Sequence, residues 1–262
     1  MKPLFFNYPK SGKSIRHILF MFTMLFFAPV FSQVNQVDAN GLKQGEWRKM
    51  TDDGTALKYI GQFKDDKPYG KFVYYYPTGE VQAVIEFSSD GSVGYSKMYH
   101  ESGYMMARGK YLDNLKDSTW VYFDDRGIVS YQEDYKNGKL DGTKIIYYEP
   151  VNGQYLVARY YSYREGLLHG EFKTYHPNTN LESEGSYDND KLNGTVKRYH
   201  SNGKLMQIER YNYGVKHGYW IFYDEEGKQV GYKLYWEGVE LKGAALTKKE
   251  EELRQQKENS GQ

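Results

Sequence analysis

The chain has 262 residues, no cysteine, and 35 Lys and Arg residues against 34 Asp and Glu, for a formal net charge of +1. The absence of cysteine excludes disulfide bonds and a lipid-modified cysteine anchor. Residues 1–32 hold four of the positive charges and no negative one, so subtracting four from +1 leaves −3 for residues 33–262. This balance excludes the basic surplus of a protein that binds nucleic acid electrostatically.

The first 32 residues have the composition of an export signal. Four basic residues precede an apolar run at 18–31: Lys2, Lys10, Lys13 and Arg16. That run is too short to span a bilayer, which takes about 20 residues of helix. We therefore predict a signal peptide over 1–32, cleaved before Gln33, and a linker over 33–40. The exported protein would be periplasmic, outer-membrane-associated or secreted; the alternative is an uncleaved N-terminal anchor.

Aromatic residues recur every 24 positions through most of the remaining chain. They are Phe63, Phe87, Tyr111 and Tyr135, and after a slip of four residues Tyr163, Tyr187, Tyr211 and Tyr235. A fixed period of this length is typical of a repeat architecture, in which each unit buries apolar surface against its neighbours. We predict a repeat array over 41–243, with about seven clear units and partial units at both ends.

Each unit, counted from its aromatic anchor as position 0, has the pattern of a β-hairpin. Position +7 is Gly70, Gly94, Gly142, Gly170, Gly194 or Gly218, with Ser118 as the exception, and position +12 is Tyr75, Tyr99, Phe123, Tyr147, Tyr175, Tyr199 or Tyr223. Position +16 is glycine in most units, and in the sixth unit we place its equivalent one residue late, at Asn180. Aromatic and β-branched residues favour strands, and the glycines suit tight reversals. The pattern predicts an all-β fold of tandem hairpins that form one elongated, twisted antiparallel sheet.

The repeated unit resembles a known family. The segment Tyr187-x2-Asp190-x3-Gly194-x4-Tyr199-x3-Gly203-x7-Tyr211 resembles the MORN repeat, and more closely its bacterial variant form; the next unit, from Tyr211 to Tyr235, shows the same pattern. The resemblance covers about 41–243 and implies a non-catalytic repeat scaffold. The family name implies membrane association, but the chain lacks a basic surplus and a basic amphipathic helix. Members are often labelled antitoxin-like, a role that a signal sequence fits poorly.

The last segment, 244–262, is a charged tail that we expect to be a short helix or disordered. Thr247 and Glu250 have the spacing of a capping box, and Glu250 and Arg254 that of a helical i,i+4 pair. Only Leu246 and Leu253 could anchor such a helix, which favours a solvated or frayed segment. Its expected structural role is to cover the edge of the last strand.

The titratable residues do not have catalytic or metal-binding spacing. His169 and His217 share position +6 in units too far apart to ligate one zinc ion. His176 and His200 share position +13 in adjacent units, where other units carry aspartate or tyrosine, so we interpret them as turn residues. The chain has neither a nucleophile elbow nor a phosphate-binding loop. We predict no enzyme activity, no catalytic or metal site and no cofactor.

Positions +9 and +11 alternate to one face of the first strand of each unit and vary from unit to unit. We interpret the aromatic that every unit carries at +12 as the stacking core and this variable face as a candidate surface for a partner. The candidate residues are Trp120, Tyr122, Trp220, Phe222, Phe72 and Tyr74. The alternative is that these aromatics pack against the second strand or the tail.

The sequence therefore predicts an exported, non-catalytic scaffold that binds another envelope or secreted protein, because aromatic-rich surfaces suit protein recognition. The alternative is carbohydrate binding, in which exposed aromatics stack on the sugars of a cell-wall or surface polysaccharide. Membrane-surface association, an antitoxin-like role and a simple spacer role are further alternatives. No nucleic acid partner is expected.

Overall fold

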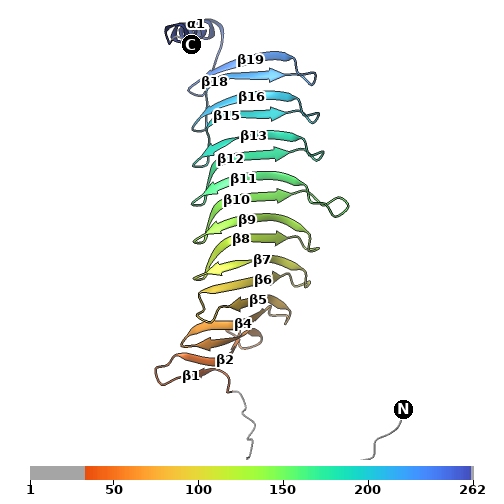
Figure 1. Ribbon diagram of the computed structural model, residues 1–262, viewed down its shortest axis with the longest axis vertical. Helices are drawn as coiled ribbons and strands as arrows, with labels where there is room; N and C mark the ends of the chain where they lie inside the picture. The colour runs from red at the N-terminus through yellow and green to blue at the C-terminus, as the bar shows by residue number, and fades with distance from the viewer. Residues whose placement is uncertain (1–32, 261–262) are drawn as a thin grey trace, which may run out of the picture. The chain divides into compact units, whose positions relative to one another are not determined.

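The array is a single antiparallel sheet in which the chain winds back and forth from one end to the other. The computed structural model describes residues 33–260, so the predicted signal peptide lies outside the described residues. Twenty strands form one sheet, and successive strands pair with each other along the chain (Figure 1). The predicted all-β class and the tandem hairpins are confirmed.

The strands are short and evenly spaced. They are β1 (Gln36–Val37), β2 (Lys43–Met50), β3 (Leu57–Lys64), β4 (Lys67–Tyr75), β5 (Val81–Phe87), β6 (Val93–Tyr99), β7 (Met105–Leu112), β8 (Leu115–Phe123), β9 (Val129–Lys136), β10 (Lys139–Tyr147), β11 (Val157–Arg164), β12 (Leu167–Tyr175), β13 (Leu181–Asp188), β14 (Lys191–Leu192), β15 (Gly194–Tyr199), β16 (Leu205–Asn212), β17 (Val215–Lys216), β18 (Gly218–Tyr223), β19 (Gln229–Trp236) and β20 (Val239–Leu241). Strand β1 lies in the segment predicted as a linker and pairs with β2.

One edge of the array consists of two-residue turns directly after each anchor. Both residues of these turns have positive φ, for example 50° at Asn137 and 79° at Gly138, or 45° at Tyr213 and 86° at Gly214. Turns of this kind match the right-handed twist of the strands that they join. The exception is the β5–β6 connection, a longer turn that ends at Gly91.

The opposite edge consists of turns that end in a residue with positive φ at +16. Gly79, Gly103, Gly127, Gly203 and Gly227 all have φ between 79° and 101°. In the sixth unit this residue is Thr179, with φ of 71°, and not Asn180, so our placement of the glycine equivalent one residue late is wrong. The turn keeps its length, and a β-branched residue takes up the strained conformation.

The glycine at +7 marks a bulge in the first strand of a unit. Its φ is 63° at Gly70 and 97° at Gly170, and Ser118, the one non-glycine, has the same left-handed conformation with φ of 58°. The pairing between β7 and β8 shifts register beside Ser118. Gly94 differs: its φ is not positive, and β5 pairs with β6 without a shift.

The core lies on the face that carries the anchors and position +9, which we call the core face. Phe72, Trp120, Phe172, Val196 and Trp220 at +9 are all buried. The aromatic residues at +12 point to the opposite, outer face and are only half-buried. Our interpretation of +12 as the core is therefore wrong.

The tail forms a helix, α1 (Gly243–Asn259), that packs against the last hairpin. The ammonium group of Lys249 lies 3.5 Å from the centre of the Trp236 ring, and Tyr232 donates a hydrogen bond to Glu250. The predicted capping box does not form, because the helix starts four residues before Thr247, and Arg254 pairs with Glu251 in place of Glu250. Within residues 33–260, α1 is too short and too polar to cross a bilayer.

Candidate functional site

The predicted partner-binding residues line the core face, and the structure buries the largest of them. Trp120 is 0%, Phe72 2% and Trp220 6% exposed. Tyr122 and Phe222, two residues further along their strands, are half-buried at the border of this core, as is Tyr74. These aromatics therefore pack within the array, which is the alternative interpretation stated above, and we place no partner contact on the two tryptophans.

Two contacts explain why a tryptophan can be buried on one face of a single sheet. The indole of Trp120 lies against Gly109, where a Cβ atom would come within 2.2 Å of the ring. Lys116 covers it from the other side, with its ammonium group 4.7 Å from the ring centre. The Trp120 indole N–H also donates a hydrogen bond to the carbonyl of Lys110.

The lysine that covers a tryptophan recurs in the array and was not recognised from the sequence. Lys216 lies 4.4 Å from the ring centre of Trp220, and Lys43 lies 5.1 Å from that of Trp47. In all three cases the lysine precedes the tryptophan by four residues, so a Lys-x3-Trp spacing is the signal that could have identified these pairs. Cation–π contacts of this kind stabilise partly desolvated aromatic clusters.

A polar network crosses the core face in the middle of the array. Lys116 donates to the hydroxyl of Tyr122 at 2.6 Å, and Tyr135 donates to the buried Glu133 at 2.7 Å. Lys144 forms an ion pair with the other oxygen of Glu133 at 2.7 Å. Burial, together with the bond to Glu133, raises the pKa of Tyr135 to about 12, and burial lowers the pKa of Lys116. The hydrogen bonds and the ion pair within the network compensate the buried charge of Glu133, so the network is a structural element of the core.

The histidines and tyrosines at +13 connect neighbouring repeats. The Nε2 atoms of His176 and His200 lie 3.0 and 3.1 Å from the carbonyls of Tyr199 and Tyr223 in the next unit. Tyr76 donates its hydroxyl proton to the Tyr99 carbonyl in the same way. The sequence located these side chains in turns but did not show the bond between repeats. Within residues 33–260 no group of three potential ligands could hold a metal ion.

The outer face has a hollow of about 710 Å³ between β5 and β8. Val84 and Val121 form its apolar floor, and Tyr95, Lys97 and Arg108 line its rim. Tyr95 is 63% exposed. The hollow lies where the β5–β6 hairpin lacks the bulge found in other units, and bulges bend and twist the strands that carry them.

Most charged side chains around this hollow are basic, and some of them form no ion pair within residues 33–260. Lys110 forms an ion pair with Asp117 at 2.6 Å. Lys97 and Arg108 are exposed, and neither forms an ion pair with another residue in the described part of the chain. Glu86 is the acidic side chain on the rim. The sequence did not predict this site, because our prediction of a binding surface rests on aromatic residues that vary between units, and not on a lysine and an arginine on neighbouring strands.

The outer face is also the face on which α1 packs. Tyr219 and Tyr232, whose ring centres are 5.7 Å apart, lie on it at the last hairpin, and Tyr232 bonds to Glu250 of the helix. Tyr95 occupies the same position, +8, as Tyr219. The outer face thus binds the helix α1 at one end of the array. At the hollow, the equivalent residue Tyr95 is exposed.

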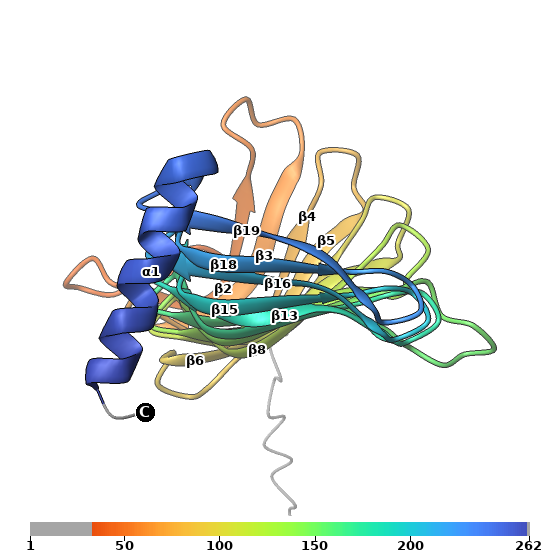
Figure 2. The same cartoon turned by 90° about the horizontal axis from the view of Figure 1, so that it is seen from above.

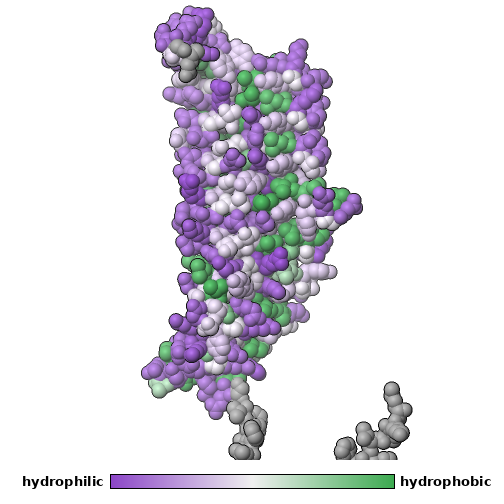
Figure 3. All heavy atoms as spheres, viewed as in Figure 1, coloured by the Kyte–Doolittle hydropathy of each residue, from purple (hydrophilic) through white to green (hydrophobic). Residues whose placement is uncertain are grey.

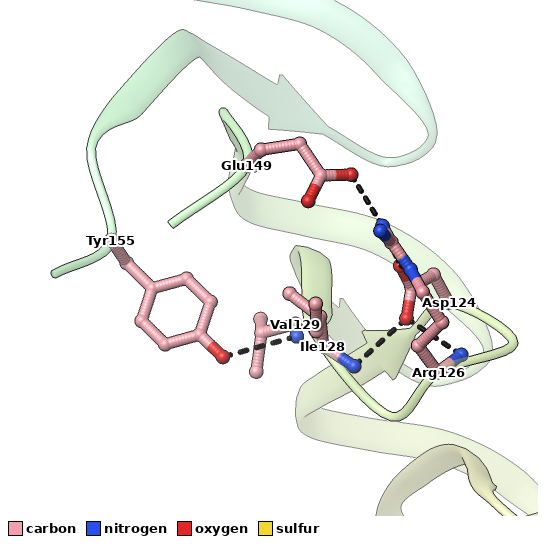
Figure 4. Close-up of polar contacts among 6 residues, drawn as sticks. All are labelled: Asp124, Arg126, Ile128, Val129, Glu149 and Tyr155. Carbon is pink, nitrogen blue, oxygen red and sulfur yellow. Dashed lines mark hydrogen bonds and ion pairs between the residues drawn. The ribbon is translucent and has the colours of Figure 1, made fainter. Parts of the chain in front are cut away.

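The turns of the edge opposite the two-residue turns form a second, more polar surface. Figure 4 shows Arg126 between the carboxylates of Asp124 and Glu149, and Tyr155 from the longest turn reaching the backbone of Val129. The backbone N–H of Ile128, and further bonds from Arg126, keep the pKa of Asp124 below its usual value. All these partners lie within adjacent turns, so the contacts stabilise the edge.

The view in Figure 3 shows small hydrophobic patches that recur along the array and are separated by hydrophilic side chains. Such a surface differs from the continuous apolar face of an obligate interface. Within residues 33–260 the exposed tyrosines are divided among the outer face (Tyr95 and Tyr232, on β6 and β19), one edge (Tyr104 and Tyr155) and the other edge (Tyr213), so they do not form the row of platforms that carbohydrate binding would need.

Comparison with known proteins identifies the repeat. The MORN repeat variant family matches residues 168–189 and 192–213, which are consecutive units of the array from β12 to β16. No curated protein matches the chain. MORN repeats are in general protein- or membrane-binding motifs. The chain therefore contains MORN repeats of the variant type, matched in the two consecutive units at 168–213.

Proposed function

We propose that the protein is an exported, non-catalytic scaffold that binds another envelope or secreted protein through the outer-face hollow between β5 and β8. The observation that carries this proposal is the pairing of an apolar floor with two exposed cations. Val84 and Val121 would receive an apolar side chain of the partner, and Lys97 and Arg108 an acidic one. Export rests on the leader-like composition of residues 1–32.

The size and chemistry of the hollow suit a protein segment. A volume of about 710 Å³ holds several side chains. Arg108 is partly preorganised, because its guanidinium lies 5.8 Å from the centre of the Phe123 ring. A preorganised arginine beside an exposed tyrosine is typical of the residues that dominate binding energy at protein interfaces.

Affinity capture from an envelope extract tests the proposal, with the purified protein as bait and both protein and sugar analysis of the bound fraction. The test variant is Lys97→Glu/Arg108→Glu, which reverses the charge of the rim. The matched control is Lys173→Glu/Lys197→Glu. Both of these outer-face lysines are at +10, the position that Lys97 has in its own unit. We expect one enriched protein that the test variant loses and the control retains.

Other outcomes separate the alternatives. Equal capture by both variants would place the partner on another surface. Enriched polysaccharide without protein would replace protein binding by carbohydrate binding. Folding of each variant is checked by its thermal unfolding. The two residues of the test variant lie away from ion pairs in the described part of the chain, and their substitution should change stability by less than about 0.5 kcal/mol. The two lysines of the control lie 3.9 and 3.8 Å from Glu171 and Glu184, so the control is expected to lose somewhat more, up to about 1 kcal/mol per exposed pair.

A further inference from the structure

The last repeat of the array is incomplete. In the two preceding units a short strand at the turn (β14, β17) is followed by a longer strand that starts at +7 (β15 at Gly194, β18 at Gly218). After the anchor Tyr235 the chain forms the short strand β20, but the helix α1 begins at Gly243, position +8. The longer strand of this unit is therefore missing.

The missing strand leaves half of β19 with only one neighbour. Strand β18 pairs with β19 from Gln229 to Tyr235, whereas β20 pairs only with Leu234, Tyr235 and Trp236. Residues 229–233 thus have a free edge within the described part of the chain. Val230 is 62% and Tyr232 46% exposed. Figure 2 shows α1 crossing one end of β19 and leaving the rest of the strand uncovered.

The backbone groups that point to this edge follow from the hairpin geometry. Trp236 and Val239 flank the two-residue turn at 237–238 and pair with each other, so their backbone groups face one another. Backbone groups alternate along an antiparallel strand, and Leu234 therefore also faces β20. By the same alternation, the N–H and C=O groups of Tyr232 point to the free edge; the regular alternation ends at Val230, where the pairing with β18 shifts register. The free groups of Tyr232 form a template for one more strand.

The other end of the array is closed. Strand β1 pairs with β2, and the side chain of Asn35 bonds to both the N–H and the C=O of Arg48, at 2.7 and 3.1 Å. Pairing with the edge of another copy in a head-to-tail chain would need both ends to be free. The free edge of β19 therefore favours an added strand that ends the sheet.

We propose that an extended segment of a protein partner adds to the edge of β19 and takes the place of the missing strand. The register of the repeats specifies its chemistry. Position +10 pairs with position −3, as Val121 does with Arg108 and Ile221 with Ile208. This position is β-branched in four units and lysine in three, so a β-branched side chain is the commonest one to lie opposite Tyr232. Such a pair is favourable in antiparallel sheets.

The neighbouring position of the segment accepts a large side chain. Position +11 pairs with −4, which is Gly231 in the last unit, and a Cβ atom at Gly231 would meet nothing within 4 Å. In other units position +11 carries a large residue such as Tyr122 or Phe222. The edge thus fits a segment in which a β-branched residue precedes a large apolar or aromatic one. This site is separate from the outer-face hollow, so each proposal can fail alone.

The test uses a labelled peptide of residues 142–148, whose Ile145 and Ile146 occupy +10 and +11, with the purified protein. Amide hydrogen exchange of the free protein should show Tyr232 exchanging at least tenfold faster than Gly231 and Lys233, whose amides bond to β18. The peptide should protect Tyr232 selectively, and binding is measured by fluorescence anisotropy.

Two matched peptides test the strand geometry. N-methylation of Ile145 removes an N–H that would bond to the edge and should weaken binding at least tenfold, whereas N-methylation of Ile146, whose amide points away, should preserve most of it. The variant Tyr232→Pro removes the edge donor at a place where proline is tolerated, and it should weaken binding more than Tyr232→Ala does. The wild-type protein with the two peptides decides the question if this variant does not fold.

Three results would overturn the inference. Slow exchange of Tyr232 in the free protein would mean that the edge is already closed, and sedimentation would show whether a second copy closes it. Equal binding of both N-methylated peptides would mean that the peptide does not add as a strand. Protection of the outer-face hollow in place of β19 would locate the peptide at the other site.

Discussion

At the scale of single residues, the core depends on a match of large and small side chains along the centre of the core face. Phe72 lies against Gly61 and Trp120 against Gly109, where an added Cβ would come within 2.2 Å of either ring. Where no large aromatic is present, the pairing changes to Ile85 with Ser96. The volume of one side chain therefore limits that of its neighbour.

Gly109→Ala should lower the free energy of unfolding by about 2 kcal/mol or more, because the indole of Trp120 is fully buried and cannot move away cheaply. Gly231→Ala is the matched control: an added Cβ meets nothing within 4 Å, and the change should be neutral or slightly stabilising. Chemical denaturation of the two variants measures both values. Equal destabilisation would mean that loss of glycine, and not the contact with Trp120, limits stability.

At Thr179, a turn residue, substitution by glycine should increase stability. Its φ of 71° is unfavourable for a β-branched residue, whereas five other units have glycine at this position. Thr179→Gly should therefore raise the free energy of unfolding by about 1 kcal/mol. Thr78→Gly, one position before the corresponding Gly79, should lower it slightly, because glycine there only adds freedom to the unfolded chain. A stabilising effect of both changes would contradict this explanation.

At the scale of elements, neighbouring hairpins are joined by side chains as well as by the ladder of the sheet. Tyr76 donates to the Tyr99 carbonyl at 2.8 Å, across the boundary between two units. Tyr76→Phe should lower the free energy of unfolding by about 1 kcal/mol, since the carbonyl loses its partner. Tyr104→Phe, at a hydroxyl-bearing ring that is 54% exposed, should change it little. Thermal unfolding of both variants measures the difference.

The 24-residue period was enough to predict tandem hairpins, because most turns have glycine, asparagine or aspartate at a fixed place. The period could not show which face is buried. Position +9 varies from Phe72 through Ser96 to Lys144, and this variation was interpreted as a sign of a binding surface. The residue on the neighbouring strand changes together with the residue at +9. Lys144 forms an ion pair with the buried Glu133, whereas Trp120 packs on Gly109. Compensated variation is a property of a core.

The end of the array was only partly predictable. The sequence predicted a tail that covers the last strand edge, and α1 covers one end of β19. The open part of the edge depends on the residue at which the helix starts, and Lys242 provides no side-chain cap that would mark this start in the sequence. The outer-face hollow was also not predictable, since it lies at the β5–β6 pair, whose missing bulge the 24-residue period does not show.

At the scale of the whole molecule, the many half-buried tyrosines make the array sensitive to alkaline pH. Burial, reinforced by hydrogen bonds to Glu133, Glu184 and Glu209, raises the pKa values of Tyr135, Tyr199 and Tyr211 to about 12. Burial also raises the pKa of Tyr122. Lys116 changes the free energy of unfolding with the opposite sign, because burial lowers its pKa. It is a single group, whereas several tyrosines have a raised pKa.

The sign of the effect follows from proton linkage. Below pH 10, the ordinary tyrosine pKa, the hydroxyls are neutral in both states and their contribution to stability is complete. Between pH 10 and 12 the unfolded chain loses protons that the folded array still holds, so the free energy of unfolding falls as pH rises. Urea denaturation should show little dependence from pH 8 to 9 and a steep loss above 10. The double variant Tyr135→Phe/Tyr211→Phe should reduce that slope, and phenolate absorbance should appear together with unfolding. Titration of Tyr135, Tyr199 and Tyr211 near pH 10 in the folded protein would contradict the prediction.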